Sequence, residues 1–266
     1  IFGMGGYSSF PVCLAAKILR IPFIIYENNM YIGKTNKYLL RYTEKIFVSY
    51  SSLKGIDKKY NKKIFEVGNI LREEIFNFKN SYTKESEKKF KILILGGSQA
   101  AKSFGEKLPD VFKRCSDTGI KLQIYQQCQL SQKKILEELY NKLGIENKIF
   151  DFNNDLSKYF NKIDISITRS GSSMLAELLN CNIPFISIPL PNSAENHQFQ
   201  NAKYFENKGY GLLIEEHEIV NKLFPLIKLL HDDKELLIKI KKKQKQHSDK
   251  NVFEKIYIET KNFLND

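Results

Sequence analysis

The segment from Thr168 to Ala202 holds the densest set of residues in this chain that could do chemistry. It reads TRSGSSMLAELLNCNIPFISIPLPNSAENHQFQNA. This order predicts a strand entering a Ser/Gly turn, a helix carrying Glu177, a second strand over residues 183–188, and a polar loop bracketed by prolines. Such a unit places a helix amino end and a polar loop at one edge of a parallel sheet. Nucleotides and sugar phosphates bind at that kind of edge.

Two serines and a glutamate give the helix of this segment its chemical interest. Ser172 and Ser173 stand at its start, and either is a natural N-cap. Glu177 comes four residues after Ser173, so it is not the N3 partner of a capping box that begins there. Helical side chains lean toward the amino end, so Glu177 could accept hydrogen bonds from ribose hydroxyls. A surface glutamate stabilised by the helix dipole is an equally good interpretation.

The loop after the second strand adds three polar side chains. His197, Gln198 and Asn201 offer donors and acceptors that match sugar hydroxyls. The prolines at 189 and 191 cannot continue a ladder, so the chain must leave the sheet here. A histidine in a polar loop is more often a plain surface residue than a catalytic base.

A second turn of this kind, residues 96–98 (Gly-Gly-Ser), follows a predicted strand and opens another helix. Glycines let the backbone approach a ligand, and the helix amino end favours a diphosphate. The turn is not a Walker A sequence, so a tight strand–helix turn explains it equally well. Two weaker candidates precede it: the glycine turn Gly3–Ser9, and Tyr26–Asn29 with Gly33–Asn36 behind it.

The sequence carries no metal signature: no HExxH, no cysteine cluster and no Asp-x-Asp pair. We therefore expect neither a metal nor a cofactor. The four cysteines are scattered, which indicates reduced, mostly buried thiols in a cytosolic protein. No apolar run approaches the ~20 residues that span a bilayer, and there is no secretory signal.

The chain has 266 residues, a net charge of +12 and a pI of about 9.3. That balance favours anionic partners such as nucleic acid, acidic lipid or phosphorylated ligands. A lysine-rich composition explains the charge without any partner, and the run 239–245 (KIKKKQK) fits a helix surface better than a binding site. With 42% hydrophobic residues, the chain can form one large domain or two ordinary ones.

Short apolar runs alternate with helical stretches along the whole chain. The runs that predict strands are 21–26, 45–49, 64–67, 90–95, 122–125, 148–150, 163–168, 183–188 and 211–214. Helices are expected between them, for example over 101–116 and 131–143. The alternation predicts an α/β fold with parallel sheets covered by helices.

The polar stretch 77–89 (NFKNSYTKESEKK) lacks periodicity and indicates a linker. We assign 1–75 to a first domain, 76–88 to the linker and 89–245 to a second domain. Residues 246–266 are assigned to a C-terminal helix that packs back on the first domain. The chain opens on the end of a strand with no initiator Met, so we expect the first domain to be incomplete.

Taken in order, the motifs between Gly3 and Glu215 resemble those of the MurG family of peptidoglycan glycosyltransferases. GMGGYSS is similar to the family's second glycine loop, and YENNxxxGKTNK resembles HEQNxxxGxxN. GNILR resembles GNPVR, GGSQAA resembles GGSQGA, and RSGSSMLAE resembles RSGAxTxxE. PLPNSAENHQFQNA resembles the family's proline-bracketed loop that ends in H-Q-x-x-N-A.

The resemblance implies a GT-B fold, with two Rossmann-like domains, parallel sheets and the active site in the cleft between them. It implies transfer of N-acetylglucosamine (GlcNAc) from UDP-GlcNAc to lipid I, which is undecaprenyl-pyrophosphoryl-MurNAc-pentapeptide. The product is lipid II, and the transfer inverts configuration and needs no metal. The implied location is the cytoplasmic face of the bacterial inner membrane, as a peripheral protein in contact with anionic lipid and not with nucleic acid.

The resemblance also implies roles for individual residues. Ser98 would contact the diphosphate, Glu177 the ribose and Gln198 the GlcNAc hydroxyls. The full set implied for UDP-GlcNAc is Asn29, Arg72, Ser98, Asn153, Ser172, Ser173, Met174, Leu175, Ala176, Glu177 and Gln198. Asn153 would act through its backbone near the uracil. The implied acceptor loop is Gly5, Gly6 and Tyr7.

The chain departs from the family pattern at several positions. The family's first glycine loop, with its candidate base histidine, would precede Ile1, which leaves the catalytic base unknown and Glu27 as a candidate. Tyr26 stands where the family has His, and Ala100 where it has Gly. We therefore expect this chain to bind UDP-GlcNAc weakly without turning it over.

Three other functions stay open. A diacylglycerol glycosyltransferase resembles the family in its donor half, and competition between UDP-GlcNAc and UDP-galactose would separate the two. A UDP-GlcNAc 2-epimerase fits the Gln198 loop poorly. A non-enzymatic basic module that binds RNA or membrane predicts affinity that collapses with salt and no effect of UDP.

Overall fold

The computed structural model of the chain describes residues 1–79, 89–151, 153 and 155–265, without the side chains of 98–101 and 262–265. By its contacts the chain divides into two compact units. Unit 1 comprises Ile1–Arg72, Asn192–Asn201 and Ser248–Asp266, and unit 2 comprises Glu73–Pro191 and Ala202–His247. Of the predicted linker 76–88, residue 76 ends helix α3 (Glu73–Phe76), and residues 80–88 lie outside the described part.

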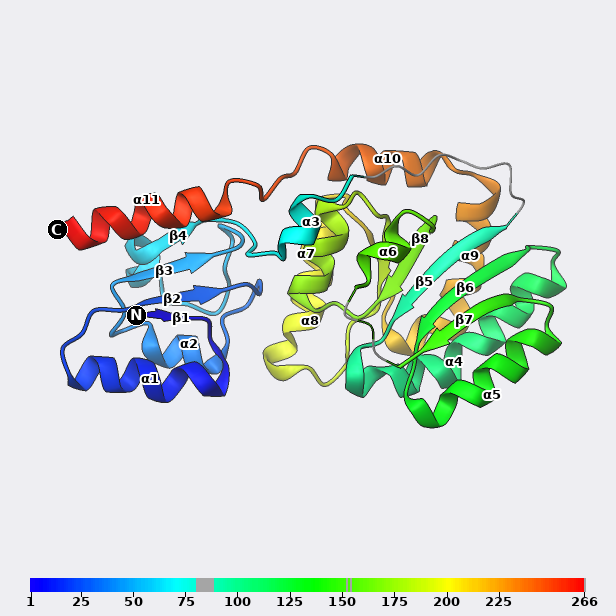
Figure 1. The fold of residues 1–266 in the computed structure, drawn as a ribbon, viewed down its shortest axis with the longest axis horizontal. Coiled ribbons are helices and arrows are strands. Elements are labelled where there is room, and N and C mark those ends of the chain that lie inside the picture. The colour runs from blue at the N-terminus through cyan, green and yellow to red at the C-terminus, as the bar shows by residue number, and fades with distance from the viewer. Residues whose placement is uncertain (80–88, 152, 154, 266) are drawn as a thin grey trace. The chain divides into compact units, whose positions relative to one another are not determined.

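Unit 1 is built on a parallel sheet with the strand order β1-β2-β3-β4. Its strands are β1 (Phe2–Gly3), β2 (Ile24–Glu27), β3 (Lys45–Val48) and β4 (Ile64–Glu66), and its helices are α1 (Gly6–Ile18), α2 (Lys34–Leu39) and α11 (Val252–Asn265). In Figure 1, α1 and α2 lie together on the β1 side of the sheet and α11 runs along the β4 side. Apolar residues of β2 and β3 pack with Cys13 of α1 and Leu39 of α2 to form the core.

The C-terminal segment is fastened to unit 1 by buried polar contacts. The Asp249 carboxylate accepts hydrogen bonds from the backbone N–H and the side-chain amide of Asn69, both at 3.0 Å. Gly68 has φ +101, and a Cβ at this position would stand 2.6 Å from the Asp249 carboxylate. Only glycine therefore fits this turn. Further along, Lys45 Nζ of β3 pairs with Glu259 of α11 at 2.7 Å.

Unit 2 is built on a parallel sheet with the strand order β10-β9-β8-β5-β6-β7. Its strands are β5 (Phe90–Leu95), β6 (Leu122–Gln127), β7 (Glu146–Phe150), β8 (Ile165–Thr168), β9 (Phe185–Ser187) and β10 (Leu212–Leu213). Its longer helices are α4 (Gly97–Asp117), α5 (Leu130–Lys142), α7 (Ser172–Asn180), α9 (Phe224–Asp232) and α10 (Glu235–Gln244), with α6 (Ser157–Phe160) short and α8 (His197–Asn207) shared with unit 1. Helices α5 and α9 both pack against α4 (Figure 1). The predicted α/β fold of parallel sheets is confirmed.

Four predicted strands begin later than expected, and two of them do so for the same physical reason. The runs 21–26 and 183–188 start as strands only at Ile24 and Phe185. The N–H groups of Ile21 and Ile183 instead bond back to carbonyls at the ends of the preceding helices, Ala16 and Leu178. A proline follows each of them and has no N–H to offer a ladder.

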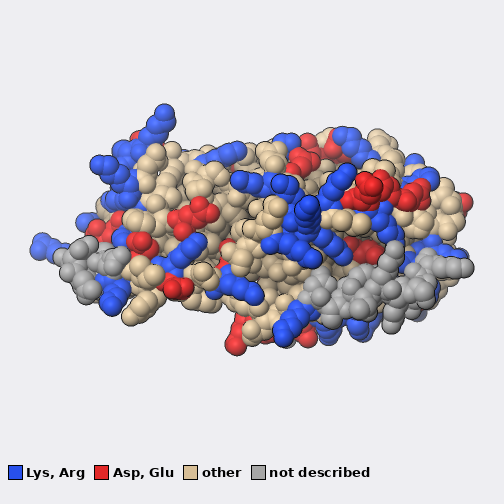
Figure 2. Space-filling view, turned by 90° about the horizontal axis from the view of Figure 1, so that it is seen from above, with Lys and Arg blue, Asp and Glu red and all other residues tan. Residues whose placement is uncertain are grey.

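Basic side chains are spread over the surface. Figure 2 shows Lys and Arg over much of the visible face, with Asp and Glu among them. On α10, the last turn carries Lys241, Lys242 and Lys243, and Lys239 lies 3.5 Å from Glu235. This mixed surface agrees with a solvated helix face.

Candidate functional site

The carboxyl edge of the unit 2 sheet is the first candidate site. β5 pairs with β6 on one side and with β8 on the other, so the strand order reverses between β5 and β8. Open parallel sheets bind ligands at such a switch point. Both predicted turns lie there, one after β5 and one after β8, and the Arg169 N–H donates to the Leu95 carbonyl at 3.1 Å. Ser98 stands in the first turn of α4, and its side chain lies outside the described part.

Helix α7 presents its amino end to this switch point. The prediction that Ser172 or Ser173 caps the helix is wrong, because the helix begins at Ser172 and its N-cap is Gly171. Glu177 is largely buried, with 8% of its surface exposed, so it is not a plain surface glutamate. Leu175 and Ala176 are fully buried in the core, which leaves only their backbones for a ligand. The half-buried Met174 and the exposed Ser173 lie outside that core.

A buried ion pair supports the turn before α7. Arg169 lies 2.6 Å from Glu216, and its guanidinium donates to the carbonyls of Ile188 and Pro189 at the end of β9. Glu216 also accepts from Lys107 at 3.0 Å and Ser103 at 2.9 Å. Burial alone would raise the pKa of Glu216, but the hydrogen bonds from Lys107, Arg169 and Ser103 outweigh it and lower that pKa. The pair fixes the carboxyl ends of β8 and β9 together.

Asn153, predicted near the uracil, follows the end of β7. Its side-chain oxygen accepts from the Asp155 N–H at 3.0 Å, and its amide nitrogen lies 3.4 Å from the Tyr159 hydroxyl. Tyr159 stacks on Phe150 of β7, with ring centroids 5.3 Å apart. The Asn153 side chain is thus used within its own turn, in keeping with a contact through the backbone.

The prediction that His197, Gln198 and Asn201 lie in a polar loop is wrong, because helix α8 begins at His197. The segment Asn192–Asn201, a loop and the first turns of α8, belongs by its contacts to unit 1, although the sequence places it in the second domain. A short 3-10 turn, Ala194–Asn196, precedes α8, and Glu195 and Asn196 adopt left-handed backbone with φ of 52° and 53°. Such strained non-glycine residues gather at ligand-binding segments. The Ala194 carbonyl oxygen lies 2.6 Å from His197 Nδ1, so this histidine stabilises the turn at residues 194–196. Gln198 is half-buried, and its N–H donates to Ser193 Oγ at 3.3 Å.

Unit 1 contains a cavity of about 510 Å³ beside this loop. Its walls combine the predicted acceptor loop with the residues after β2 and with the loop before α8. They include Gly5, Gly6, Tyr7, Glu27, Asn29, Asn36, Glu195 and His197. Gly5 and Gly6 have φ of +77 and +75, which lets the chain turn sharply into α1. Tyr7 is 98% exposed beside the cavity.

Glu27 is a positioning residue in this structure. It is buried, and one carboxylate oxygen accepts from the N–H and the side-chain amide of Asn29 at 3.1 and 3.0 Å. The other oxygen accepts from the Gly33 N–H at 2.9 Å and the Asn36 amide at 3.0 Å. The four hydrogen bonds that this carboxylate accepts hold the surrounding loop in place. This use disfavours Glu27 as the general base.

Tyr26, which replaces the family's histidine, also has a structural role. Its hydroxyl lies 2.8 Å from Ser49 Oγ, donates to the Gly68 carbonyl at 3.1 Å and accepts from the Ile70 N–H at 3.2 Å. Burial raises the pKa of Tyr26, so it is a poor proton donor near neutral pH. These bonds fix the turn that leads to the exposed Arg72.

Glu216 and Asp249 were not indicated by the sequence. Each is a single acidic residue in a charged stretch, and its partners lie far away in the chain: Glu216 contacts Arg169 and Ser103, and Asp249 contacts Asn69. No local pattern identifies such a residue.

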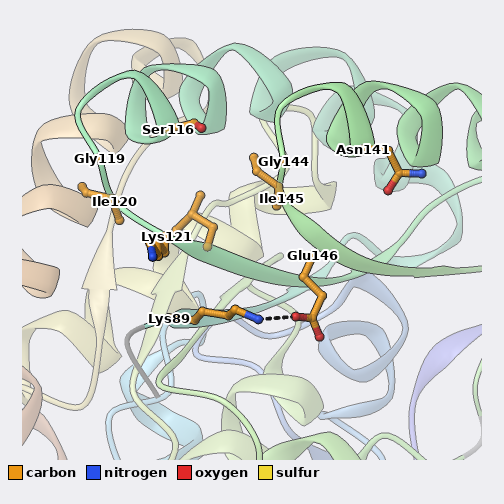
Figure 3. Close-up of a pocket in the computed structure, with 10 residues that line it drawn as sticks. Lys89, Ser116, Gly119, Ile120, Lys121, Asn141, Gly144, Ile145 and Glu146 are labelled. Atoms are coloured by element: carbon orange, nitrogen blue, oxygen red, sulfur yellow. Dashed lines mark hydrogen bonds and ion pairs between the residues drawn. The ribbon is translucent and has the colours of Figure 1, made fainter. Parts of the chain in front are cut away.

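A second hollow, of about 690 Å³, lies at the opposite edge of the unit 2 sheet. Figure 3 shows it between the ends of α4 and α5, at Ser116 and Asn141, and the starts of β6 and β7, with Lys89 and Glu146 paired at 2.5 Å. Parallel sheets bind ligands at their carboxyl edge, so this hollow is not the candidate site. Across the described residues, no cluster of three or more His, Cys, Asp or Glu side chains could hold a metal ion. No helix among the same residues is long and apolar enough to cross a membrane.

Two α/β units with parallel sheets, with helix amino ends at the switch point of one sheet and a glycine-loop cavity in the other unit, are the features of a GT-B protein that handles a nucleotide sugar. Residues 91–256 match the glycosyltransferase family 28 C-terminal domain, and residues 1–48 match the N-terminal domain of that family. The chain belongs to glycosyltransferase family 28.

Curated relatives share one description, UDP-N-acetylglucosamine–N-acetylmuramyl-(pentapeptide) pyrophosphoryl-undecaprenol N-acetylglucosamine transferase. The relative from Pelagibacter ubique (strain HTCC1062) is 34% identical over 100% of this chain and 74% of its own length. The one from Rickettsia felis (strain ATCC VR-1525 / URRWXCal2) is 34% identical over 91% of this chain and 72% of its own length. The resemblance to the MurG family is confirmed.

Solved structures also show similarity to the MurG family. The crystal structure of Acinetobacter baumannii MurG is similar with a TM-score of 0.71 and 26% identity, covering 93% of this chain and 68% of that one. The S. aureus MnaA–UDP structure has a TM-score of 0.70 at 16% identity, with 99% of this chain and 75% of that one covered. At that identity the second likeness concerns the fold alone.

Proposed function

We propose that this chain carries the donor site for the transfer of GlcNAc from UDP-GlcNAc to lipid I, the reaction that forms lipid II and UDP. One observation carries the proposal: the two turns that align with the family's donor motifs both lie at the switch point of the unit 2 sheet. The relatives named for this reaction support it, since the similarity runs over the whole chain.

In the proposed complex, the amino ends of α4 and α7 face the diphosphate. Each carries a partial positive charge that stabilises the departing UDP, so the transfer needs no metal. Glu177 accepts hydrogen bonds from the ribose hydroxyls, and Ser98 contacts the diphosphate. Ser172, Ser173 and the backbone of residues 174–176 complete this wall, with Asn153 near the uracil. Asn29, Arg72 and Gln198, which belong to unit 1, keep the donor-binding roles that the family resemblance implies.

The acceptor side uses the unit 1 cavity. The acceptor's hydroxyl oxygen attacks the anomeric carbon as the bond from that carbon to the UDP oxygen breaks, and the hydroxyl proton leaves to a base. Attack opposite the leaving group inverts the configuration. Gly5, Gly6 and Tyr7 line the entry for the acceptor, and Glu27 holds the wall of the cavity without taking the proton.

The proposed setting is the cytoplasmic face of the bacterial inner membrane, where the lipid-linked acceptor lies. The net charge of +12 supports contact with anionic lipid there. No nucleic acid is needed for this role.

The experiment is a titration of the 266-residue chain with UDP-GlcNAc and UDP-galactose by calorimetry, followed by a transfer assay with a lipid I analogue. We expect UDP-GlcNAc to bind at least tenfold more tightly. Preference for UDP-galactose, or transfer to diacylglycerol, would instead support the diacylglycerol glycosyltransferase. GlcNAc transfer to the lipid I analogue would support the function and contradict the expectation that this chain does not turn over.

The same titration at two salt concentrations tests the basic binding module. A nucleotide-sugar enzyme keeps its preference for UDP-GlcNAc as salt rises, and bound ligand raises its melting temperature. A module that binds RNA or membrane by charge alone loses affinity steeply with salt and does not respond to UDP.

A further inference from the structure

A directed chain of hydrogen bonds links three side chains in unit 1. The Met30 N–H donates to Asn201 Oδ1 at 2.9 Å, and Asn201 Nδ2 donates to Asn29 Oδ1 at 3.1 Å. Asn29 Nδ2 then donates to Glu27 Oε1 at 3.0 Å. Asn201 is fully buried, with 0% of its surface exposed, and it stands 171 positions from Met30 in the sequence. The chain therefore joins the loop after β2 to helix α8.

The direction of these bonds is fixed from both ends. A backbone N–H such as that of Met30 can only donate. At the other end, both oxygens of the Glu27 carboxylate already accept from backbone N–H groups, those of Asn29 and Gly33. Asn201 must turn its oxygen toward Met30 and its nitrogen toward Asn29. Asn29 must then turn its oxygen toward Asn201 and its nitrogen toward Glu27. Reversing either amide would set donor against donor or acceptor against acceptor.

This arrangement decides what Asn29 can offer to a ligand in the cavity that it lines. Both hydrogens of its amide are used, one by Glu27 and one by Asn28 Oδ1 at 3.1 Å. Its oxygen has two lone pairs. Among the described residues, Asn201 donates to one of them, and the other can accept from a ligand. Asn29 therefore faces the cavity as an acceptor, and its ligand partner must carry an O–H or N–H. A diphosphate offers neither at neutral pH.

We propose that Asn201 is a positioning residue: it orients the Asn29 carbonyl so that this oxygen accepts a hydrogen bond from a hydroxyl of the bound sugar. The proposal rests on the proposed function, which brings a nucleotide sugar to Asn29. It adds a residue that acts through Asn29, and it states which kind of ligand atom Asn29 recognises.

The test is a double-mutant cycle on donor binding. The variants are Asn29→Ala, Asn201→Ala, the double variant, and Asn201→Asp, which can still accept from Met30 but cannot donate to Asn29. The matched control is Gln200→Ala, because Gln200 is the preceding residue and accepts a surface hydrogen bond from Lys54 at 2.9 Å. The probes are UDP, UDP-GlcNAc, and UDP-GlcNAc analogues in which one sugar hydroxyl at a time is replaced by fluorine. Fluorine cannot donate a hydrogen bond.

We expect Asn29→Ala, Asn201→Ala and Asn201→Asp each to weaken UDP-GlcNAc binding about tenfold, the size of one hydrogen bond, while UDP binding is unchanged. The double variant should be no weaker than Asn29→Ala, and Gln200→Ala should match the wild type. One fluoro analogue should lose about the same factor on the wild type and nothing on Asn29→Ala. Effects that multiply in the double variant, or equal losses for UDP and UDP-GlcNAc, would overturn the proposal.

Amide hydrogen exchange at Met30, measured without ligand, keeps the two proposals apart. Exchange should be slow in the wild type and in Asn201→Asp, and faster in Asn201→Ala, which removes the acceptor. Equal exchange in all three contradicts the hydrogen-bond chain itself. A wild-type chain that shows slow exchange at Met30 yet binds neither UDP nor UDP-GlcNAc contradicts the proposed function.

Discussion

At the scale of single residues, a substitution of Glu27 tests whether this buried carboxylate is the catalytic base or only stabilises the loop around it. Both carboxylate oxygens of Glu27 accept hydrogen bonds, four in total. In Glu27→Gln, one oxygen becomes an NH2 group, whose hydrogens face the N–H donors that this oxygen accepted from. We expect a loss of about 1–3 kcal/mol in the free energy of unfolding, measured by urea denaturation. The exposed Glu44→Gln is the control and should stay within about 0.5 kcal/mol of the wild type.

The pH dependence of transfer separates the two roles of Glu27 further. If transfer is measurable, Glu27→Gln should keep the acid limb of the kcat/KM profile at the same pH, because Glu27 does not carry the reacting proton. Loss of that limb would identify Glu27 as the base.

Glu177 has a separate task, recognition of the ribose. Glu177→Gln keeps the shape of the side chain but removes the charge that strengthens its hydrogen bonds to hydroxyls. We expect the Kd for UDP to rise by about 10- to 100-fold, measured by calorimetry. A 2′,3′-dideoxy UDP should bind the wild type and the variant equally. If the variant weakens this analogue too, Glu177 acts through the structure of α7 and not through the ribose.

At the scale of elements, Glu216 holds the ends of β8 and β9 through Arg169. Hydrogen bonds lower the folded-state pKa of Glu216 below its ordinary value of 4.5. Its stabilisation is therefore fully present above the unfolded pKa and is lost as pH falls through the folded pKa. Glu216→Gln should be less stable than the wild type by about 1–3 kcal/mol at pH 7, and the difference should shrink below pH ~4.5. Urea denaturation across pH measures this.

The control for Glu216 is Glu106→Gln on α4. That side chain is exposed, and its ion pair with Lys102 is long at 3.9 Å. Removing the charge of Glu106 should therefore change stability little at any pH. A gap between Glu216→Gln and the wild type that stays constant from pH 7 to pH 3 would show that the charge of Glu216 is not what matters.

The elements are also the scale at which sequence prediction worked best. Strands such as those predicted at 90–95 and 183–188 show up as apolar runs because both faces of a parallel sheet are buried there. The donor turns were found for the same reason, since each lies directly after such a run. The boundaries shifted where a long-range or helix-capping bond overrode the local pattern, as at Ile21. Partners such as Asn69 with Asp249, or Met30 with Asn201, join positions too far apart in the sequence for any local pattern to connect.

At the scale of the whole molecule, unit 1 is assembled from three separate stretches of chain, and the last of them closes it. Removing residues 248–266 takes away Asp249, the buried Val252 and the Lys45–Glu259 pair. Unit 2 ends at His247 and loses none of its own residues. We expect two calorimetric transitions in the truncated chain, with that of unit 1 at the lower temperature and that of unit 2 unchanged.

A point variant makes the same argument without a truncation. Asp249→Ala leaves the Asn69 backbone N–H and amide without their acceptor, at a cost of about 1–3 kcal/mol. The exposed neighbour Lys250→Ala should cost little. UDP should stabilise only the transition of the unit that binds it, so a titration assigns the two transitions. If Asp249→Ala lowers both equally, the two units unfold as one, and the C-terminal segment stabilises the whole chain and not unit 1 alone.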